Sequence, residues 1–105
     1  MQEATFLILT ALAGGIQHGY GIITDVERIS GRRVRLRAGT LYTALERLRT
    51  DALVEVDREE IVDGRLRRYY RLTAVGQERL AAEAARLHTN ALAAMSRLDA
   101  IGASR

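Results

Sequence analysis

The chain has 105 residues, of which 48% are hydrophobic, and a formal net charge of +3. These values predict one folded domain with a modest core and exclude a disordered chain. The absence of cysteine excludes disulfides and thiolate metal sites. No apolar run is long enough to span a membrane, and the first residues lack a signal-peptide pattern, so we expect a cytoplasmic protein with no membrane partner.

The positive charge is concentrated in the middle of the chain. Between Arg28 and Arg71 there are twelve arginines and seven acidic residues, whereas the segment before Arg28 has a net charge of −3. Every basic residue is arginine, which binds phosphate and guanine through paired hydrogen bonds. This distribution permits a polyanionic partner.

Residues 4–13 form the first predicted helix, which is apolar nearly all round. Only Thr5 and Thr10 interrupt the apolar run, and Gly14–Gly15 ends it. A helix without a polar face is buried on more than one side. In so small a domain, we expect a partner subunit to cover the second side through Phe6 and Leu9.

The second predicted helix begins at His18–Gly21 and ends at Ser30–Gly31. Its core face consists of aliphatic residues at helical spacing, which are Ile22 or Ile23, Val26 and Ile29. Tyr20 is interpreted as a core aromatic residue. His18 stands among turn glycines, and only His88 supplies another imidazole, so a capping role is favoured over a catalytic or metal-binding role.

The third predicted helix runs from Ala38 to about Thr50. Its apolar face has i, i+3, i+4, i+7 spacing and consists of Leu41, Ala44, Leu45 and Leu48. The opposite face carries groups that can hydrogen-bond a phosphate or a base edge, and arginines crowd the segment before the helix. We expect this region to contact DNA through Arg35, Arg37, Thr40, Tyr42, Thr43 and Arg47.

A hairpin of two strands follows, over residues 53–60 and 65–72. Asp63–Gly64 is the signal of a two-residue turn, but the corresponding register would divide the apolar side chains between the two faces. A three-residue loop, Val62–Gly64, is preferred because it keeps them together. In that register the apolar pairs are Val54 with Leu72 and Val56 with Tyr70.

The preferred register also separates the arginines of the hairpin. The expected cross-strand pairs are Glu55 with Arg71, Glu59 with Arg67, and Arg58 with Arg68, with Arg65 at the tip. Arg58 and Arg68 would repel each other unless an anion bound between them. We therefore predict DNA contacts from Arg58, Arg65 and Arg68; the alternative is a solvated hairpin whose arginines only keep its edge soluble.

Thr73 is the predicted N-cap of a long alanine-rich helix from about Ala74 to Leu98 or slightly beyond. Its apolar residues alternate four and three apart, as in a coiled-coil seam, and are Leu80, Ala84, Leu87, Ala91, Ala94, Leu98 and Ile101. The three-helix unit is complete without this helix, so we expect it to form a homodimer. The predicted dimer contacts are Phe6, Leu9, Leu80, Ala84, Leu87, Ala91 and Leu98.

The order of these elements predicts an α+β, mostly α, fold: a winged helix-turn-helix of three helices plus a two-stranded wing, with a long C-terminal dimerisation helix. Residues 1–73 would form the DNA-binding domain and residues 74–105 the dimerisation helix. The sequence shows no catalytic grouping, phosphate-binding glycine loop or metal-ligand cluster, so we expect no enzyme, metal or cofactor. The competing function is a winged-helix protein-interaction module that does not bind DNA.

Three motifs resemble the PadR family of bacterial transcriptional regulators. They are His18-Gly19-Tyr20, then Gly39-Thr40-Leu41-Tyr42 with Leu45-x-Arg47-Leu48, and Arg68-Tyr69-Tyr70-Arg71-Leu72-Thr73-x-x-Gly76. The short C-terminal part resembles the small subgroup, which has a single C-terminal helix. The resemblance implies a homodimeric repressor of palindromic double-stranded operator DNA that responds to a small molecule.

The resemblance also implies that a small apolar or aromatic effector binds near the dimer helices. His88 is a candidate contact for it, and an exposed surface histidine is the alternative. The chain departs from the family pattern in having Arg37–Ala38 where Ser-Pro is frequent, and it has no tryptophan for a stacking pocket. Loss of the serine cap should cost about 1 kcal/mol at the start of the third helix.

Overall fold

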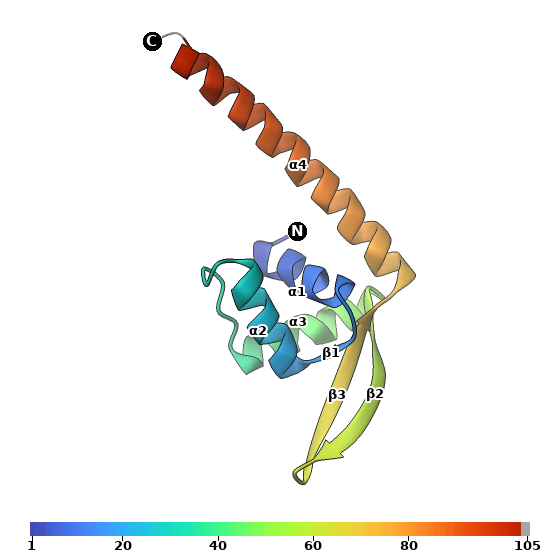
Figure 1. The fold of residues 1–105 in the computed structure, drawn as a ribbon. Helices are drawn as coiled ribbons and strands as arrows, with labels where there is room; N and C mark the ends of the chain where they lie inside the picture. Colours follow the sequence, from blue (N-terminus) through green and yellow to red (C-terminus); the bar gives the residue numbers. More distant parts are fainter. Residues whose placement is uncertain (104–105) are drawn as a thin grey trace.

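The computed structural model describes residues 1–103, which form four helices and a three-stranded antiparallel sheet (Figure 1). The helices are α1 (Glu3–Ala13), α2 (Gly19–Ile29), α3 (Ala38–Thr50) and α4 (Ala74–Ala103). The strands are β1 (Gln17–His18), β2 (Val54–Val62) and β3 (Arg65–Leu72). The predicted helices and both hairpin strands are therefore confirmed, although β2 continues past its predicted end. Residues 104 and 105 of the predicted dimerisation segment lie outside the described residues.

Helix α1 occupies the centre of the folded body, where it packs against α2, β3 and α4. Its buried residues are Leu7, Ile8, Leu9, Ala11 and Leu12. Leu9 has no exposed surface, so the core of the protomer covers it rather than a partner subunit, which corrects the expectation for this side chain. Phe6 is partly buried against the same core. In α2, Ile22 and Val26 are buried, whereas Ile29 in the last turn is 43% exposed.

The sheet has three strands rather than the predicted two, because β1 pairs with β3 on the side opposite β2. Gln17 pairs with Tyr70, and His18 pairs with Tyr69. A strand of two residues is too short to produce an alternating pattern of hydrophobicity, so no periodic signal in the sequence marks it.

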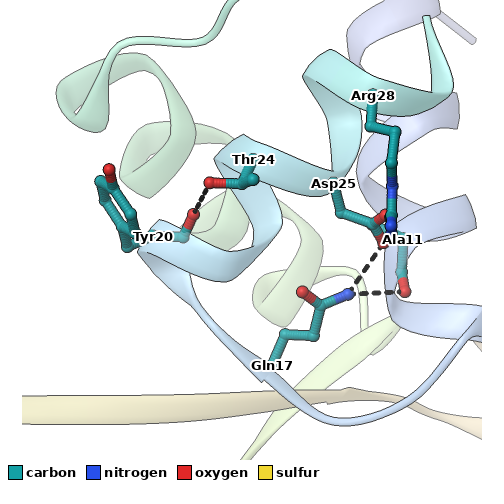
Figure 2. Close-up of polar contacts among 6 residues, drawn as sticks. All are labelled: Ala11, Gln17, Tyr20, Thr24, Asp25 and Arg28. Atoms are coloured by element: carbon teal, nitrogen blue, oxygen red, sulfur yellow. Dashed lines mark hydrogen bonds and ion pairs between the residues drawn. The ribbon is translucent and has the colours of Figure 1, made fainter.

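The side chain of Gln17 holds β1 against two helices (Figure 2). Its Nε2 group donates hydrogen bonds to the carbonyl oxygen of Ala11 and to Oδ2 of Asp25, each at 3.0 Å. Asp25 also accepts a hydrogen bond from Arg28 at 2.6 Å. The Arg28 hydrogen bond, together with the Gln17 bond, lowers the pKa of the Asp25 carboxyl below its usual range, so the carboxylate is ionised at neutral pH.

The hairpin keeps the predicted apolar pairs, but its turn is different. Val54 pairs with Leu72, and Val56 pairs with Tyr70, as predicted. The turn is the two-residue Asp63–Gly64, with φ angles of 52° and 76°. Two successive positive φ angles are typical of a type I′ turn, whose twist suits a β-hairpin. The predicted three-residue loop is therefore wrong.

A β-bulge in β2 reconciles this turn with the apolar pairs. The register shifts between Val56 and Arg58, so Asp57 is skipped in the pairing. Beyond this residue the cross-strand pairs are Arg58 with Tyr69, Glu59 with Arg68, Glu60 with Arg67, Ile61 with Leu66, and Val62 with Arg65. The predicted pairs Arg58–Arg68 and Glu59–Arg67 are wrong, whereas the Glu55–Arg71 pair, which precedes the bulge, is confirmed.

The start of α4 is fastened to the connection between α3 and β2. Thr73 Oγ1 accepts a hydrogen bond from the Gly76 amide at 2.9 Å, which confirms the predicted N-cap, and donates one to the Ala52 carbonyl at 2.6 Å. Gly76 lies so close to the Leu53 carbonyl that a β-carbon there would overlap the oxygen. This close approach requires glycine.

Beyond Leu80, α4 projects away from the body (Figure 1). Every described residue after Leu80 is exposed except Glu83, which is partly covered. Within residues 1–103, no helix combines the length and the apolar character needed to cross a bilayer.

Candidate nucleic-acid interface

Helix α3 buries its apolar face and exposes the face predicted to contact DNA. Leu41, Leu45 and Leu48 are buried, and the polar residues of the opposite face are exposed. Arg37 is the N-cap residue, and its side chain makes no capping hydrogen bond. The first-turn amides of α3 therefore have no side-chain cap, in agreement with the absence of serine at this position.

Two clefts run along the sides of α3. The first lies between the hairpin and the beginnings of α2 and α3, and Tyr42, Arg65 and Arg68 line it. The second lies between α3 and the N-terminal part of α1, and it is lined by Thr40, Thr43 and Arg47. Six of the nine predicted DNA contacts therefore line these two clefts, four from α3 and two from β3.

The other three predicted contacts lie outside these clefts. Arg35 forms an ion pair with Glu27 at 3.5 Å, and Arg37 is exposed at the start of α3. Arg58 stacks on the ring of Tyr69, with its guanidinium carbon 4.0 Å from the ring centre. The strand register beyond the bulge thus gives Arg58 an aromatic partner instead of the predicted arginine neighbour.

Tyr42 is held by the first turn of α2. Its side chain is 46% exposed, and its phenol end lies against Gly19, which is buried. A β-carbon at Gly19 would be 2.5 Å from the Tyr42 hydroxyl oxygen. Gly19 therefore leaves the space that Tyr42 occupies, a relationship that the sequence analysis missed.

Tyr20 is not a core residue. It is 74% exposed, and Figure 2 shows its ring pointing away from the cluster around Gln17. It lines the same cleft as Tyr42. The sequence does contain a signal for this outcome, because Thr24, one helical turn later, is polar, whereas the core face continues through Ile22 and Val26.

His18 caps α2, as predicted. Its Nδ1 atom accepts a hydrogen bond from the Gly21 amide at 3.2 Å, and its ring meets Tyr69 edge-on, with the ring centres 5.5 Å apart. Burial lowers the pKa of His18, the positive charge of Arg67 lowers it further, and Glu60 opposes both. The neutral imidazole is the form that can accept the capping hydrogen bond.

The ion pairs of the hairpin divide its arginines into two groups. Arg68 lies 3.3 Å from Glu59, and Arg71 donates a hydrogen bond to Glu55 at 2.6 Å. Other arginines near α3 and the hairpin form no ion pair with any carboxylate among residues 1–103, and these are Arg37, Arg47, Arg65 and Arg67. Their charge is available to an anionic partner.

Three short helices, with an exposed polar face on the third and a β-hairpin after it, define a winged helix-turn-helix protein, and the hairpin is its wing. The family model described as "Transcriptional regulator PadR-like family" matches residues 8–82. The chain therefore belongs to the PadR-like family of transcriptional regulators, which are not enzymes.

Relatives of known sequence share substantial identity with the chain. A transcriptional regulator of Mycobacterium tuberculosis is 39% identical over 73 residues, a match that covers 70% of this chain and 64% of the relative. A 37.1 kDa protein in a Streptomyces fradiae transposon is 44% identical over 82 residues, which are 78% of this chain and 22% of that protein. The chain thus spans less than two thirds of the length of these relatives.

Solved structures show the same fold. A PadR family regulator from Clostridium difficile has a TM-score of 0.71 and 24% identity, with 88% of this chain and 94% of that chain covered. Bacillus subtilis PadR, solved in complex with operator DNA, has a TM-score of 0.68 and 22% identity, with 77% and 47% covered.

Proposed function

We propose that this protein regulates transcription by binding double-stranded DNA in a sequence-specific manner. Helix α3 enters the major groove, and the wing lies along the adjacent backbone and minor groove. The observation that carries the proposal is the pair of clefts flanking α3, because residues suited to phosphate and base contacts from separate parts of the sequence meet there. The relative from Bacillus subtilis, whose structure contains operator DNA, supports the same use of the fold.

The charge of the interface supports a polyanionic partner. Arg47 on α3 and Arg65 at the wing tip are both exposed and form no ion pair within the described chain. Arg37 adds a third unpaired charge at the start of α3. Neutralising phosphates with such groups releases condensed counterions, so the affinity should fall steeply as salt is added.

We further propose that the protein acts as a homodimer joined through α4. This helix has 30 residues, and its apolar side chains stand in solvent in the protomer. The exposed fraction is 40% for Leu87, 65% for Leu98 and 57% for Ile101. Because a second copy would cover this seam, the dimer removes apolar surface from water. A two-fold dimer would read two half-sites, which makes the operator palindromic.

The resemblance to the family supports the remaining parts of the proposal. The protein acts in the cytoplasm as a repressor, and a small apolar or aromatic effector releases it from the operator. Alanines along α4 leave room for such a molecule between the dimer helices, and His88 is the candidate polar contact. Binding of a hydrophobic dye to the native dimer would support this pocket, and no detectable binding would count against it.

The deciding experiment selects duplexes from a randomised library with the intact protein at low salt. We expect a two-fold symmetric sequence to be enriched and the logarithm of its affinity to fall linearly with the logarithm of salt concentration. Arg47→Gln should weaken binding, whereas the matched variant Arg97→Gln, which changes an exposed arginine on α4, should not. If no duplex is enriched, the DNA-binding function is wrong and a protein-interaction module becomes the better interpretation.

A further inference from the structure

Two exposed aliphatic side chains lie together near the tip of the wing. Ile61 and Leu66 are direct cross-strand partners, and they are 73% and 56% exposed. The ends of an exposed hairpin usually carry polar or charged residues, because an apolar edge invites aggregation. An aliphatic pair at this position therefore calls for a functional explanation.

The pleat of the strands places this pair on the face turned toward α3. Side chains alternate along β3, so Leu66 and Arg68 share the face from which Tyr70 enters the core. Leu66 lines the same cleft as Tyr42 of α3. Ile61, as the partner of Leu66, extends this face across to β2. The pair thus borders the space in which α3 would hold DNA.

Unpaired positive charge flanks Leu66 on β3 and indicates the chemistry of the partner. Arg65 precedes Leu66 and Arg67 follows it, and although strand alternation directs both toward the opposite face, both line the same cleft as Leu66. Neither forms an ion pair within the described chain, whereas Arg68, on the face of Leu66, is paired with Glu59. An apolar pair whose Leu66 shares a cleft with two unpaired arginines suits a surface that has anionic edges and an uncharged floor. The minor groove of DNA has both, since phosphates line its rims and sugars and base edges form its walls and floor.

We propose that Ile61 and Leu66 enter the minor groove beside the site read by α3 and select A·T base pairs there. A G·C pair presents the guanine N2 amino group on the floor of this groove, whereas an A·T pair presents acceptors alone. Aliphatic side chains cannot accept a hydrogen bond, so a covered amino group would lose its water without gaining a partner. This inference rests on the proposed DNA binding and adds a specificity-determining pair to it.

The test uses the duplex selected by the protein, prepared with flanks of A·T, G·C or inosine·C pairs at the position of the wing. An inosine·C pair presents the major-groove pattern of G·C but lacks the N2 amino group. We expect the natural protein to bind A·T and inosine·C flanks equally and G·C flanks about tenfold more weakly. The result would trace the preference to one amino group in the minor groove.

The double variant Ile61→Thr/Leu66→Thr should bind all three flanks alike, because its hydroxyl groups can accept a hydrogen bond from the amino group. Threonine is β-branched and therefore suits a strand, and near-unchanged circular dichroism would verify the fold. The slope of log affinity against log salt should not change, since no charge is removed. Ile29→Thr is the matched control, because Ile29 is 43% exposed at the far end of α2 and should keep the preference.

The possible outcomes separate this inference from the proposed function. Equal binding of the natural protein to all three flanks, or a preference that persists in the double variant, would overturn the role of the pair and leave DNA binding intact. Weaker self-association of the double variant with unchanged flank preference would identify the pair as a protein contact instead. No binding to any duplex would overturn both proposals.

Discussion

The hydroxyl end of Tyr42 lies against the backbone of Gly19, which connects the exposed start of α3 to the first turn of α2. The contact leaves no room for a β-carbon at Gly19. The glycine at position 19 therefore allows the Tyr42 side chain to lie where it does. Because Tyr42 lines the cleft between α3 and the wing, this packing positions a side chain that would meet DNA in the proposed complex.

Gly19→Ala should displace Tyr42 and weaken DNA binding, with little change in melting temperature. Alanine is tolerated in a helix better than glycine, and the atoms that must move are at the end of a side chain. Tyr42→Ala alone should also weaken binding without a large loss of stability. In the Tyr42→Ala background, Gly19→Ala should have no further effect on affinity. Affinity would be measured by titration of a labelled duplex. If the losses of binding free energy in the two single variants added up in the double variant, Gly19 and Tyr42 would act separately.

Acid should destabilise the fold through His18. Folding favours the neutral imidazole, because burial and the charge of Arg67 lower the pKa of His18 below the ordinary value of 6.5. As the pH falls through that value, the unfolded chain binds a proton before the folded one does, so the free energy of unfolding decreases. The decrease ends once the pH drops below the pKa of His18 in the folded protein.

His18→Asn should remove this part of the pH dependence, since asparagine caps a helix without titrating in this range. The measurement is urea unfolding between about pH 5 and pH 8 at fixed protein concentration. His88→Asn, at an exposed position on α4, is the control. A pH dependence that survives His18→Asn but disappears in His88→Asn would contradict the prediction.

The wing arginines should differ in their contribution to the salt dependence of DNA binding. Arg65 and Arg67 form no ion pair in the described chain, so Arg65→Gln and Arg67→Gln should each reduce the slope of log affinity against log salt by about one per half-site. Arg71 is bound to Glu55, and Arg71→Gln should cost a few tenths of a kcal/mol of stability and leave the slope unchanged. If all three variants reduced the salt slope equally, the distinction between unpaired and ion-paired arginines would be wrong.

Leu87→Glu should dissociate the proposed homodimer. Leu87 is 40% exposed in the protomer and lies on the α4 seam, where a partner would surround the new carboxylate with apolar groups. We expect the dissociation constant to rise more than about tenfold, as measured by sedimentation equilibrium. Ala93→Glu introduces the same charge outside the seam, about 120° around the helix from Leu87, and should remain dimeric. A monomeric natural protein at micromolar concentration would rule out the interface.

Local signals, which are the spacing of apolar residues together with caps and turn residues, predicted most of the fold. The spacing of Leu41, Leu45 and Leu48 indicated both the position of α3 and its buried face, since a helix can cover only one side against a core. Likewise, Thr73 marked the start of α4, because a hydroxyl that can accept from the third following amide favours a helix start there. Each of these signals is local, because the residues that produce it and the structure that it predicts lie within the same short segment.

The register of the wing could not be predicted in the same way. Asp63–Gly64 indicated a two-residue turn, whereas the apolar pairing of Val54 and Val56 indicated a loop of three residues. The turn signal and the apolar pairs were both correct, and only the inferred loop length was wrong, because the bulge at Asp57 absorbs the difference of one residue. A pairing pattern read from sequence assumes an unbroken ladder, so every contact beyond the bulge was assigned to the wrong partner.

The candidate interface was predicted in part. The exposed face of α3 followed from the same periodicity that located its core, so the exposure of Thr40, Tyr42 and Thr43 is confirmed. Their contact with DNA stays a prediction. Tyr20 was misassigned because its aromatic character was given more weight than its position on the helix, where Thr24, one turn later, marks the polar face. The contact of Tyr42 with Gly19 joins different helices, and no spacing rule describes it.

The joint at Thr73 and Gly76 has a mechanical consequence for the proposed dimer. Its hydrogen bonds and close backbone packing tie the first turn of α4 to the body, so we expect the helix and the body to rotate together. A helix of 30 residues is about 45 Å long. In the proposed dimer, α4 would therefore fix the distance and the orientation of α3 and the wing relative to the dimer contact. One extra base pair at the operator centre would turn one half-site by about 35° relative to the other. If α4 cannot turn relative to the body, helix α3 of the second protomer would then face away from the major groove of its half-site.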